Sequence, residues 1–275
     1  MLAYYNFSYY RYLLMCIKSL LKGISKNPYY LFGLTFNSSP LERKRSVFRD
    51  ALNKVCCFAV LSIAIFVIPS CKSISTATTS VQVINASPDA DPVDFYLSGN
   101  LKTSTPVAYG NSSAYFLTIA GNQTGEVKTP AFSAALASVP VSLASNVNYS
   151  VFVSGQTSTN NITAFYVRDN LITPAPGKAK LRFVHAVAAA RKVNLLLNAN
   201  VIFTAIAYKS ISDYIEVPTG SYSIRANLSD STAVGVTPAF TQTFDNGKIY
   251  TIIFKGAIGA TADALKLRLG VMANN

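Results

Sequence analysis

Three aspartates in one short segment are the side chains of this sequence best placed to bind a metal ion. Asp89, Asp91 and Asp94 belong to the stretch SPDADPVD. Calcium takes about six to eight oxygen ligands, which three carboxylates and neighbouring backbone carbonyls could supply. The favoured alternative is turn chemistry, in which Ser87-Pro88-Asp89 forms a turn and the aspartate bonds to its own backbone. No other cofactor is indicated.

Catalysis needs a matched acid, base and nucleophile, and the sequence offers few candidates for such a set. His185 is the only histidine, and the chain contains no GxSxG segment of the kind that presents a nucleophilic serine. A glycosidase would need a pair of carboxylates, drawn here from acids that stand mostly in turn-like segments. We therefore expect a structural or surface histidine and a protein that is not an enzyme. The alternative is a hydrolase acting on glycan or peptide.

All four cysteines lie in the first quarter of the chain, at Cys16, Cys56, Cys57 and Cys71. The chain after Cys71 therefore has no thiols for a disulfide framework, a thiolate zinc site or a catalytic cysteine. Any special role for a thiol falls to Cys71 itself.

Cys71 stands at the end of a segment with the layout of a secretory signal. The basic stretch ERKRSVFRDALNK precedes the apolar run VCCFAVLSIAIFVI, which is shorter than the about 20 residues that span a membrane. The ending Ile68-Pro69-Ser70-Cys71 resembles the lipobox of bacterial lipoproteins, although Pro69 departs from its commonest form. The resemblance implies that the leader is removed, that acyl chains such as palmitate attach to Cys71, and that membrane lipid is the partner that holds the chain. The alternative is an uncleaved apolar helix that ends at Pro69.

The first part of the chain divides into three segments. Residues 42–71 form the signal segment, and the Ser/Thr-rich residues 72–80 read as a flexible tether. Residues 1–41 precede the signal, and two interpretations remain open for them. They are either a membrane-associated extension with a basic amphipathic helix or sequence upstream of the true translation start, which we favour.

The rest of the chain contains one pattern twice. VQVINASPDADPVDFYLSGN, residues 81–100, aligns with LRFVHAVAAARKVNLLLNAN at an offset of 100, and YSVFVSG aligns with YTIIFKG at an offset of 101. The segment between the copies, residues 171–178, contains two prolines and a glycine and reads as a linker. The sequence therefore predicts repeat 1 over residues 81–170 and repeat 2 over residues 179–275.

Each repeat has the sequence features of an all-β domain. Short runs rich in Val, Ile, Tyr, Phe and Thr recur about every 8 to 12 residues between turn-forming residues, which favours two tandem immunoglobulin-like β-sandwiches. DNGKIYTIIF resembles the tyrosine-corner segment of such domains, in which a tyrosine hydroxyl bonds back to the backbone. Tyr250 and its counterpart Tyr149 are the candidates, with simple core packing as the alternative.

These residues also support a resemblance to a known family. INASPDADPVDFYLSGN, the later AYG and the segment VPTGSYSI are similar to the bacterial domain-of-unknown-function family 4397, over residues 80–271. The resemblance implies β-sandwiches in a secreted or lipid-anchored protein of the bacterial cell envelope, and it implies no activity. Repeat 2 departs from the family pattern, because AVAAARKVN replaces the acidic loop.

Charge and aromatic content suggest the kind of partner. Repeat 1 carries three bases and five acids, a balance of −2, whereas residues 178–275 carry eleven bases and five acids, a balance of +6. We expect no nucleic-acid binding, because the basic residues are scattered rather than gathered in a stripe. Acidic envelope glycans or other surface proteins fit a basic repeat, with an ordinary solvated surface as the alternative. The expected contact residues are tyrosines at exposed or half-exposed positions, Tyr96, Tyr109, Tyr115, Tyr208 and Tyr214.

The resulting expectation is a non-catalytic envelope protein, anchored by lipid to the outer membrane, with a binding, adhesion or architectural role. A structural subunit of a larger surface complex is the remaining alternative.

Overall fold

The computed structural model describes residues 77–230 and 235–275. All described residues belong to one compact unit, Ile74–Asn275. Cys71, the signal segment and residues 72–76 of the expected tether lie outside the described residues. Within the described part of the chain, no helix has the length and apolar character needed to cross a membrane.

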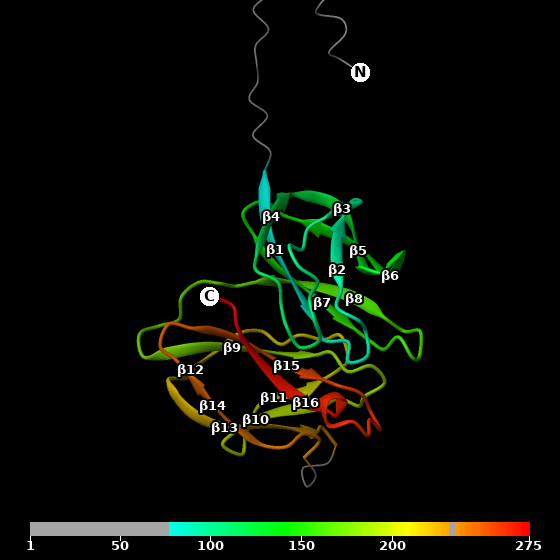
Figure 1. Cartoon of the computed structure of the whole chain (residues 1–275). Coiled ribbons are helices and arrows are strands. Elements are labelled where there is room, and N and C mark those ends of the chain that lie inside the picture. Colours follow the sequence, from blue (N-terminus) through cyan, green and yellow to red (C-terminus); the bar gives the residue numbers. More distant parts are fainter. Residues whose placement is uncertain (1–76, 231–234) are drawn as a thin grey trace, which may run out of the picture. The chain divides into compact units, whose positions relative to one another are not determined.

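Repeat 1 is a β-sandwich of two four-stranded sheets (Figure 1). The first sheet has the order β4 (Phe116–Ile119), β1 (Thr78–Asn85), β7 (Asn148–Ser154) and β8 (Thr163–Asp169). The second has the order β3 (Asn100–Leu101), β2 (Asp94–Leu97), β5 (Gly121–Thr129) and β6 (Phe132–Leu143). The central strands β1 and β7 run parallel, and the other neighbouring strands run antiparallel.

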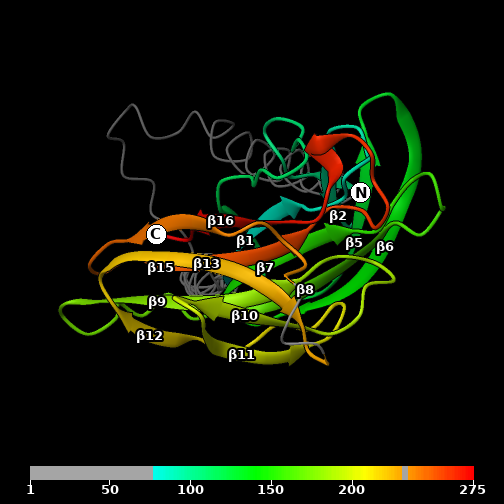
Figure 2. The same ribbon diagram turned by 90° about the horizontal axis from the view of Figure 1, so that it is seen from below.

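Repeat 2 has the same strand arrangement, which Figure 2 shows from below. Its first sheet has the order β12 (Ile215–Pro218), β9 (Lys178–His185), β15 (Ile249–Lys255) and β16 (Arg268–Ala273). Its second has the order β11 (Asn200–Ile206), β10 (Val193–Leu197), β13 (Gly220–Leu228) and β14 (Phe240–Phe244), and the short 3₁₀ helix η2 (Asp263–Leu265) precedes β16. Strand by strand, the two repeats correspond, so the expected all-β fold with two sandwich domains is confirmed. The first strands begin at Thr78 and Lys178, slightly before the boundaries expected from the sequence.

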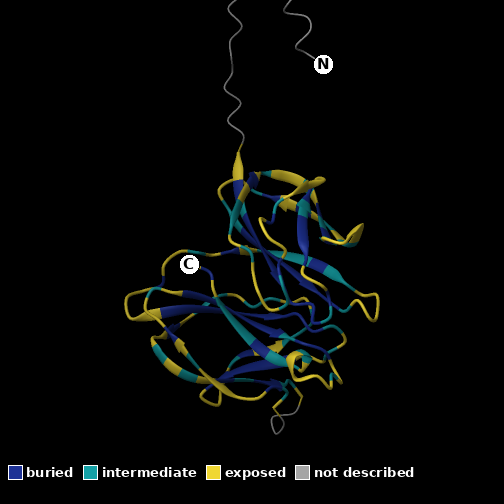
Figure 3. Ribbon diagram, in the orientation of Figure 1, coloured by how far each residue is buried: buried dark blue, intermediate teal, exposed yellow. Residues whose placement is uncertain are grey.

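The first strand of each repeat is buried on both of its faces (Figure 3). Val81 and Val83 of β1 point into the core of repeat 1, and the alternate residue Ile84 belongs to a different apolar cluster. Alternate residues of a strand face opposite sides of its sheet, so the outward faces of β1 and β9 are covered as well. Strands buried on both sides read as nearly continuous apolar runs, which explains the composition of VQVINA and LRFVHA.

The cluster on these outward faces contains residues from both repeats. Its buried members are Ile84, Ala86 and Phe152 of repeat 1 and Val184, Ala186 and Ile253 of repeat 2. The two repeats therefore share an apolar contact in addition to their separate cores, and the sheets that meet there are the ones that contain the parallel strand pairs.

Candidate functional site

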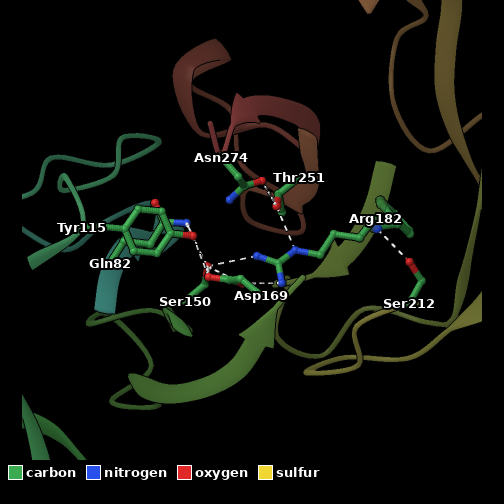
Figure 4. Close-up of polar contacts among 9 residues, drawn as sticks. Gln82, Tyr115, Ser150, Asp169, Arg182, Ser212, Thr251 and Asn274 are labelled. Carbon is green, nitrogen blue, oxygen red and sulfur yellow. Dashed lines mark hydrogen bonds and ion pairs between the residues drawn. The ribbon is translucent and has the colours of Figure 1, made fainter. Parts of the chain in front are cut away.

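The most unusual side chain in this contact is Arg182, in the middle of β9. Only 1% of its surface is exposed, and its guanidinium forms an ion pair with Asp169, the last residue of β8, with 2.7 Å between Nη1 and Oδ1 (Figure 4). Nη2 donates to the Ser150 hydroxyl at 3.0 Å, and Nε donates to Thr251 Oγ1 at 2.8 Å. A buried charge is tolerated when it is paired and hydrogen-bonded, and Arg182 meets both conditions by reaching from repeat 2 into repeat 1.

The Asp169 carboxylate is held by further donors from repeat 1. The Tyr115 hydroxyl donates to Oδ2 at 2.6 Å, and the Ser150 hydroxyl lies 2.9 and 2.8 Å from the two carboxylate oxygens. Gln82 Nε2 donates to both of these hydroxyls, at 2.9 Å to Tyr115 and 2.8 Å to Ser150. Burial and the neighbouring negative charge of Asp169 raise the pKa of Tyr115, so the phenol stays protonated and keeps donating.

We call Gln82, Tyr115, Ser150, Asp169, Arg182, Tyr214, Thr251 and Asn274 the inter-repeat polar cluster. The Tyr214 ring lies against the guanidinium of Arg182, with 5.0 Å from the ring centre to Cζ, and burial raises the pKa of Tyr214 to about 12. Thr251 donates to Asn274 Oδ1 at 2.7 Å. The cluster thus joins the repeats by one ion pair, set among neutral hydrogen-bonding groups.

Most of the tyrosines expected to contact a ligand are used in this contact between the repeats. Besides Tyr115 and Tyr214, the Tyr208 hydroxyl lies 3.0 Å from Ser154 Oγ of the other repeat, and Lys255 Nζ lies 4.8 Å from the centre of the Tyr109 ring. The hydroxyls of Tyr109 and Tyr214 are buried. The expectation that these residues keep their polar tips in water is therefore wrong for Tyr109 and Tyr214.

Tyr96 is the member of that group that lies away from the cluster. It is half-buried on β2, and Lys128 Nζ lies 4.7 Å from its ring centre. Lys128 also pairs with Glu126 at 3.1 Å, so this site is a small cation–π contact on the sheet surface.

A cleft opens beside the polar cluster. Its volume is about 340 Å³, and its lining includes Arg168, Asn170, Arg182, Ser212, Asp213 and Tyr214. Asp213 is the only carboxylate in this lining, and the lining contains no histidine or cysteine. The chemistry that the cleft offers is hydrogen bonding and charge, which suits binding of a polar group.

The sequence comparison identifies the repeats. A family model described as a domain of unknown function, DUF4397, matches residues 79–196 and again residues 181–272. The chain belongs to the DUF4397 family. Two matches agree with the two expected repeats, and a search of curated proteins finds no match.

Two solved structures resemble the DUF4397 chain only distantly. The Bacillus anthracis TIE protein is 11% identical, with a TM-score of 0.22, and the match covers 66% of this chain and 34% of that one. A leucine-rich repeat protein from Bacteroides thetaiotaomicron is 12% identical, with a TM-score of 0.17, and the match covers 67% of this chain and 26% of that one. The DUF4397 chain therefore spans about a third and about a quarter of the lengths of these two proteins.

The acidic segment of the first DUF4397 repeat holds a loop in place. Asp89 accepts the backbone N–H groups of Thr157 at 2.8 Å and Ser158 at 2.9 Å. Burial raises the pKa of Asp89, but these hydrogen bonds outweigh it and hold the pKa below its usual value. Asp94 accepts from the Thr103 hydroxyl at 3.0 Å, and Asp91 is exposed.

The three aspartates do not make the expected metal site. Within residues 77–230 and 235–275, no group of three or more His, Cys, Asp or Glu side chains is placed to hold a metal ion. The calcium alternative finds no support, because Asp89 and Asp94 bond to separate parts of repeat 1. The Asp89 carboxylate also bonds to the backbone of Thr157 and Ser158 rather than to that of its own turn, which the sequence favoured. The residues at the same positions of repeat 2, Ala189 and Asn194, also show that the fold does without such a site.

His185 has a structural position in the second DUF4397 repeat. The ring is fully buried, Nε2 lies 3.1 Å from the Arg191 carbonyl oxygen, and Nδ1 accepts the Val187 N–H at 3.3 Å. Burial lowers its pKa, so the neutral imidazole is favoured. Asn85 accepts the equivalent N–H in repeat 1, that of Ser87 at 3.0 Å, and donates to the Val107 carbonyl at 3.0 Å, which lies at a different position of the repeat from Arg191.

The two corner tyrosines bond back to the chain just before their strands. The Tyr149 hydroxyl accepts the Ala144 N–H at 2.9 Å, and the Tyr250 hydroxyl accepts the Asp245 N–H at 3.2 Å. In each DUF4397 repeat the bond spans five residues, and both rings belong to the core of their sandwich.

The Arg182–Asp169 pair is not predicted by the motifs and spacings of the sequence. One signal for it was present, since Arg182 interrupts the apolar stretch LRFVHA at the position where the other DUF4397 repeat has Gln82. A charge inside a strand buried on both faces requires a partner. The identity of that partner depends on how the two sheets meet, which the sequence pattern does not reveal.

Proposed function

We propose that this protein is a non-catalytic, lipid-anchored component of the bacterial cell envelope, in which the two DUF4397 repeats act together as one binding or architectural module. The observation that supports this proposal best is the inter-repeat polar cluster. The buried ion pair between Arg182 and Asp169 favours a fixed pairing of the repeats. Such a paired body is suited to presenting surfaces to a partner.

The proposed absence of catalysis is supported by the structural tasks of the candidate residues. His185 satisfies two backbone groups inside repeat 2, and Asp89 secures a loop of repeat 1. An envelope hydrolase would need such groups to be available to a substrate. Turnover of a glycan or peptide that disappears in His185→Asn or Asp89→Asn, with the fold retained, would defeat the proposal.

The proposed anchor is an acylated Cys71, and membrane lipid is its partner. Cells fed labelled palmitate should label the wild-type chain, and Cys71→Ala should lose both the label and its place in the membrane fraction. Membrane retention of the unlabelled variant would support an uncleaved apolar helix. Cys57→Ala is the matched control, because it changes a thiol within the leader and should keep the label.

Acidic envelope glycans or other surface proteins remain the proposed partners, and the distribution of basic residues narrows where they would bind. Lys178 begins β9 and Lys248 precedes the parallel strand β15, whereas Lys192 and Lys209 follow β9 at its opposite end. Lys178 is also paired with Glu216, with 3.7 Å between Nζ and Oε2. These four lysines are therefore divided between two ends, and the end with Lys192 and Lys209 is the better candidate, with Lys209 Nζ also donating to Thr163 Oγ1 of repeat 1 at 3.1 Å.

The test of this partner is binding of the chain to acidic polysaccharide at low and high salt. Binding between exposed charges weakens as salt screens them, so a salt-sensitive association that falls in Lys192→Glu and Lys209→Glu supports the proposal. Lys248→Glu, which makes the same charge change at the other end, is the matched control. Equal loss in all three variants would show a non-specific charge effect.

A further inference from the structure

The contact between the repeats is built from the same positions on both sides. Tyr208 of repeat 2 lies 3.0 Å from Ser154 of repeat 1. Lys255 is the counterpart of Ser154, and Tyr109 is the counterpart of Tyr208, because VAYG aligns with IAYK at an offset of 99. Lys255 and Tyr109 also meet, with 4.8 Å between Nζ and the ring centre. A contact that recurs with the partners exchanged is the pattern of a two-fold, isologous interface.

The apolar residues follow the same rule. Ile84 corresponds to Val184, Ala86 to Ala186, and Phe152 to Ile253, and all six are buried in one cluster. Each repeat therefore contributes the same three positions to the apolar contact. In its shape and apolar content, this surface would suit a second copy of itself.

Besides Lys255, which stands where repeat 1 has Ser154, a buried ion pair breaks this symmetry. Arg182 crosses to Asp169 at 2.7 Å, whereas their counterparts Gln82 and Asn274 are neutral. Strand pairing shows that Asp169 and Asn274 correspond. Asp169 lies opposite Asn148 on the neighbouring strand. The Asn274 N–H bonds to the carbonyl of Ile249, which is the counterpart of Asn148 in repeat 2. Gln82 bonds within repeat 1, and Asn274 within repeat 2.

We propose that the outward sheet face of each repeat is a two-fold interaction surface whose partner is restricted to the opposite repeat by the placement of Arg182 on one copy and Asp169 on the other. Two copies of repeat 1 would bury Asp169 against Gln82 in both directions. Two copies of repeat 2 would bury Arg182 against Asn274 in the same way. An unpaired buried charge is strongly unfavourable, so the charge pair selects repeat 1 with repeat 2 and disfavours the like-with-like pairing of either repeat through this face.

The first test separates the repeats after the chain has folded. A protease site is inserted in the linker at Thr173–Pro174, the folded chain is cleaved, and the products are analysed by size-exclusion chromatography with light scattering. The expected result is a 1:1 complex of the two fragments, with any excess fragment remaining a monomer. Fragments that drift apart, or that form like-with-like dimers as readily as the mixed one, would overturn the proposal.

The second test redirects the specificity. Asn274→Asp gives repeat 2 both members of the pair, so in a like-with-like dimer Arg182 of each copy would face the new carboxylate at position 274 of the other. The released repeat 2 fragment should then shift from monomer to dimer. Asn275→Asp adds the same charge one residue later, at an exposed position, and should leave the fragment monomeric. A folded Asn274→Asp fragment that stays monomeric would contradict the two-fold geometry.

A measurement on the intact chain covers the case in which a released fragment unfolds. Gln82→Arg and Asn274→Asp are each expected to lower the urea midpoint, because each buries one unpaired charge. The double variant should regain most of the loss, because the two-fold relation places the new residues against each other, as Arg182 is placed against Asp169. Losses that simply add in the double variant would overturn the proposal.

Discussion

Repeat 1 and repeat 2 have the same strand arrangement, but different side chains form hydrogen bonds to their buried backbone groups. Asn85 and His185 stand at the end of the first strand, and each accepts an N–H two residues ahead and bonds to a carbonyl of a later loop. The accepted N–H is equivalent in the two repeats, whereas the carbonyls, Val107 and Arg191, lie at different positions. The comparison teaches that this fold requires the buried backbone groups to be satisfied, and that a histidine in this position is no sign of catalysis.

The largest difference between the repeats is the charge that each contributes to the polar cluster. Repeat 1 supplies Asp169 and repeat 2 supplies Arg182, where the counterparts Asn274 and Gln82 are neutral. Removing one partner of a buried pair leaves the other charge unpaired, whereas removing both leaves only neutral groups. This asymmetry gives the strongest test of the comparison.

Asp169→Asn and Arg182→Gln are each expected to lower the free energy of unfolding by about 3 to 5 kcal/mol. The double variant, which gives both repeats the same neutral pair, should recover most of that loss. Urea unfolding followed by circular dichroism measures all three. If the loss in the double variant equals the sum of the two single losses, the two side chains act independently, and the repeats do not differ by a coupled charge pair.

The sequence predicted the strands and boundaries of each repeat better than the contact between the repeats. Alternating runs such as VDFYLSG identify strands, and the offsets of 100 and 101 identify the repeats, because these patterns depend on local chain geometry. The role of Arg182 depends on which outward faces meet, which no local pattern determines. The buried hydroxyls of Tyr109 and Tyr214 differ from the expectation for the same reason, since Tyr109 lies against Lys255 and Tyr214 against Arg182 at the contact between the repeats.

The next difference lies in the loop that follows the first strand. Asp89 of repeat 1 receives two backbone hydrogen bonds, from Thr157 and Ser158, whereas repeat 2 has Ala189 at that position. Asp89→Ala should lower stability by about 1.5 to 3 kcal/mol, the usual contribution of hydrogen bonds to a charged group. Faster amide exchange at Thr157 and Ser158 would locate the loss.

Asp91→Ala is the control for that variant, because Asp91 is exposed and its removal should change the unfolding midpoint little. Adding calcium should leave the midpoints of the wild type and of both variants unchanged. A calcium-dependent stabilisation that both substitutions abolish would restore the metal interpretation and contradict the structural role given to Asp89.

A smaller difference concerns the turn between β2 and β3 and its counterpart between β10 and β11. Gly99 has a φ of 79°, and Ala199, at the same position of repeat 2, has a φ of 67°. This left-handed conformation is unfavourable for a residue with a Cβ. Ala199→Gly should therefore raise the free energy of unfolding by about 0.5 to 1 kcal/mol, after allowance for the greater freedom of glycine in the unfolded chain.

The reverse change, Gly99→Ala, supplies the matched control. A Cβ at Gly99 would meet no atom within 4 Å, so its effect reports the backbone conformation rather than a clash. It should lower stability by a similar amount in the same urea experiment. Opposite signs for the two changes support the equivalence of the turns, and equal signs would show that the turns differ in more than this residue.

The smallest expected effect tests the equivalence of His185 and Asn85 through its dependence on pH. Burial lowers the pKa of His185 below its ordinary value of 6.5, so below that value the unfolded chain binds a proton more readily than the folded chain does. The contribution of His185 to stability is therefore fully present above the unfolded pKa and is lost as the pH falls toward the folded pKa. Between about pH 7.5 and about pH 6 the loss should be below about 1 kcal/mol.

His185→Asn, which copies Asn85, should remove this part of the pH dependence while leaving the midpoint at the higher pH nearly unchanged. If the pH dependence persists in that variant, it arises from other groups, and if the variant unfolds at neutral pH, an asparagine does not perform the task of the histidine in repeat 2.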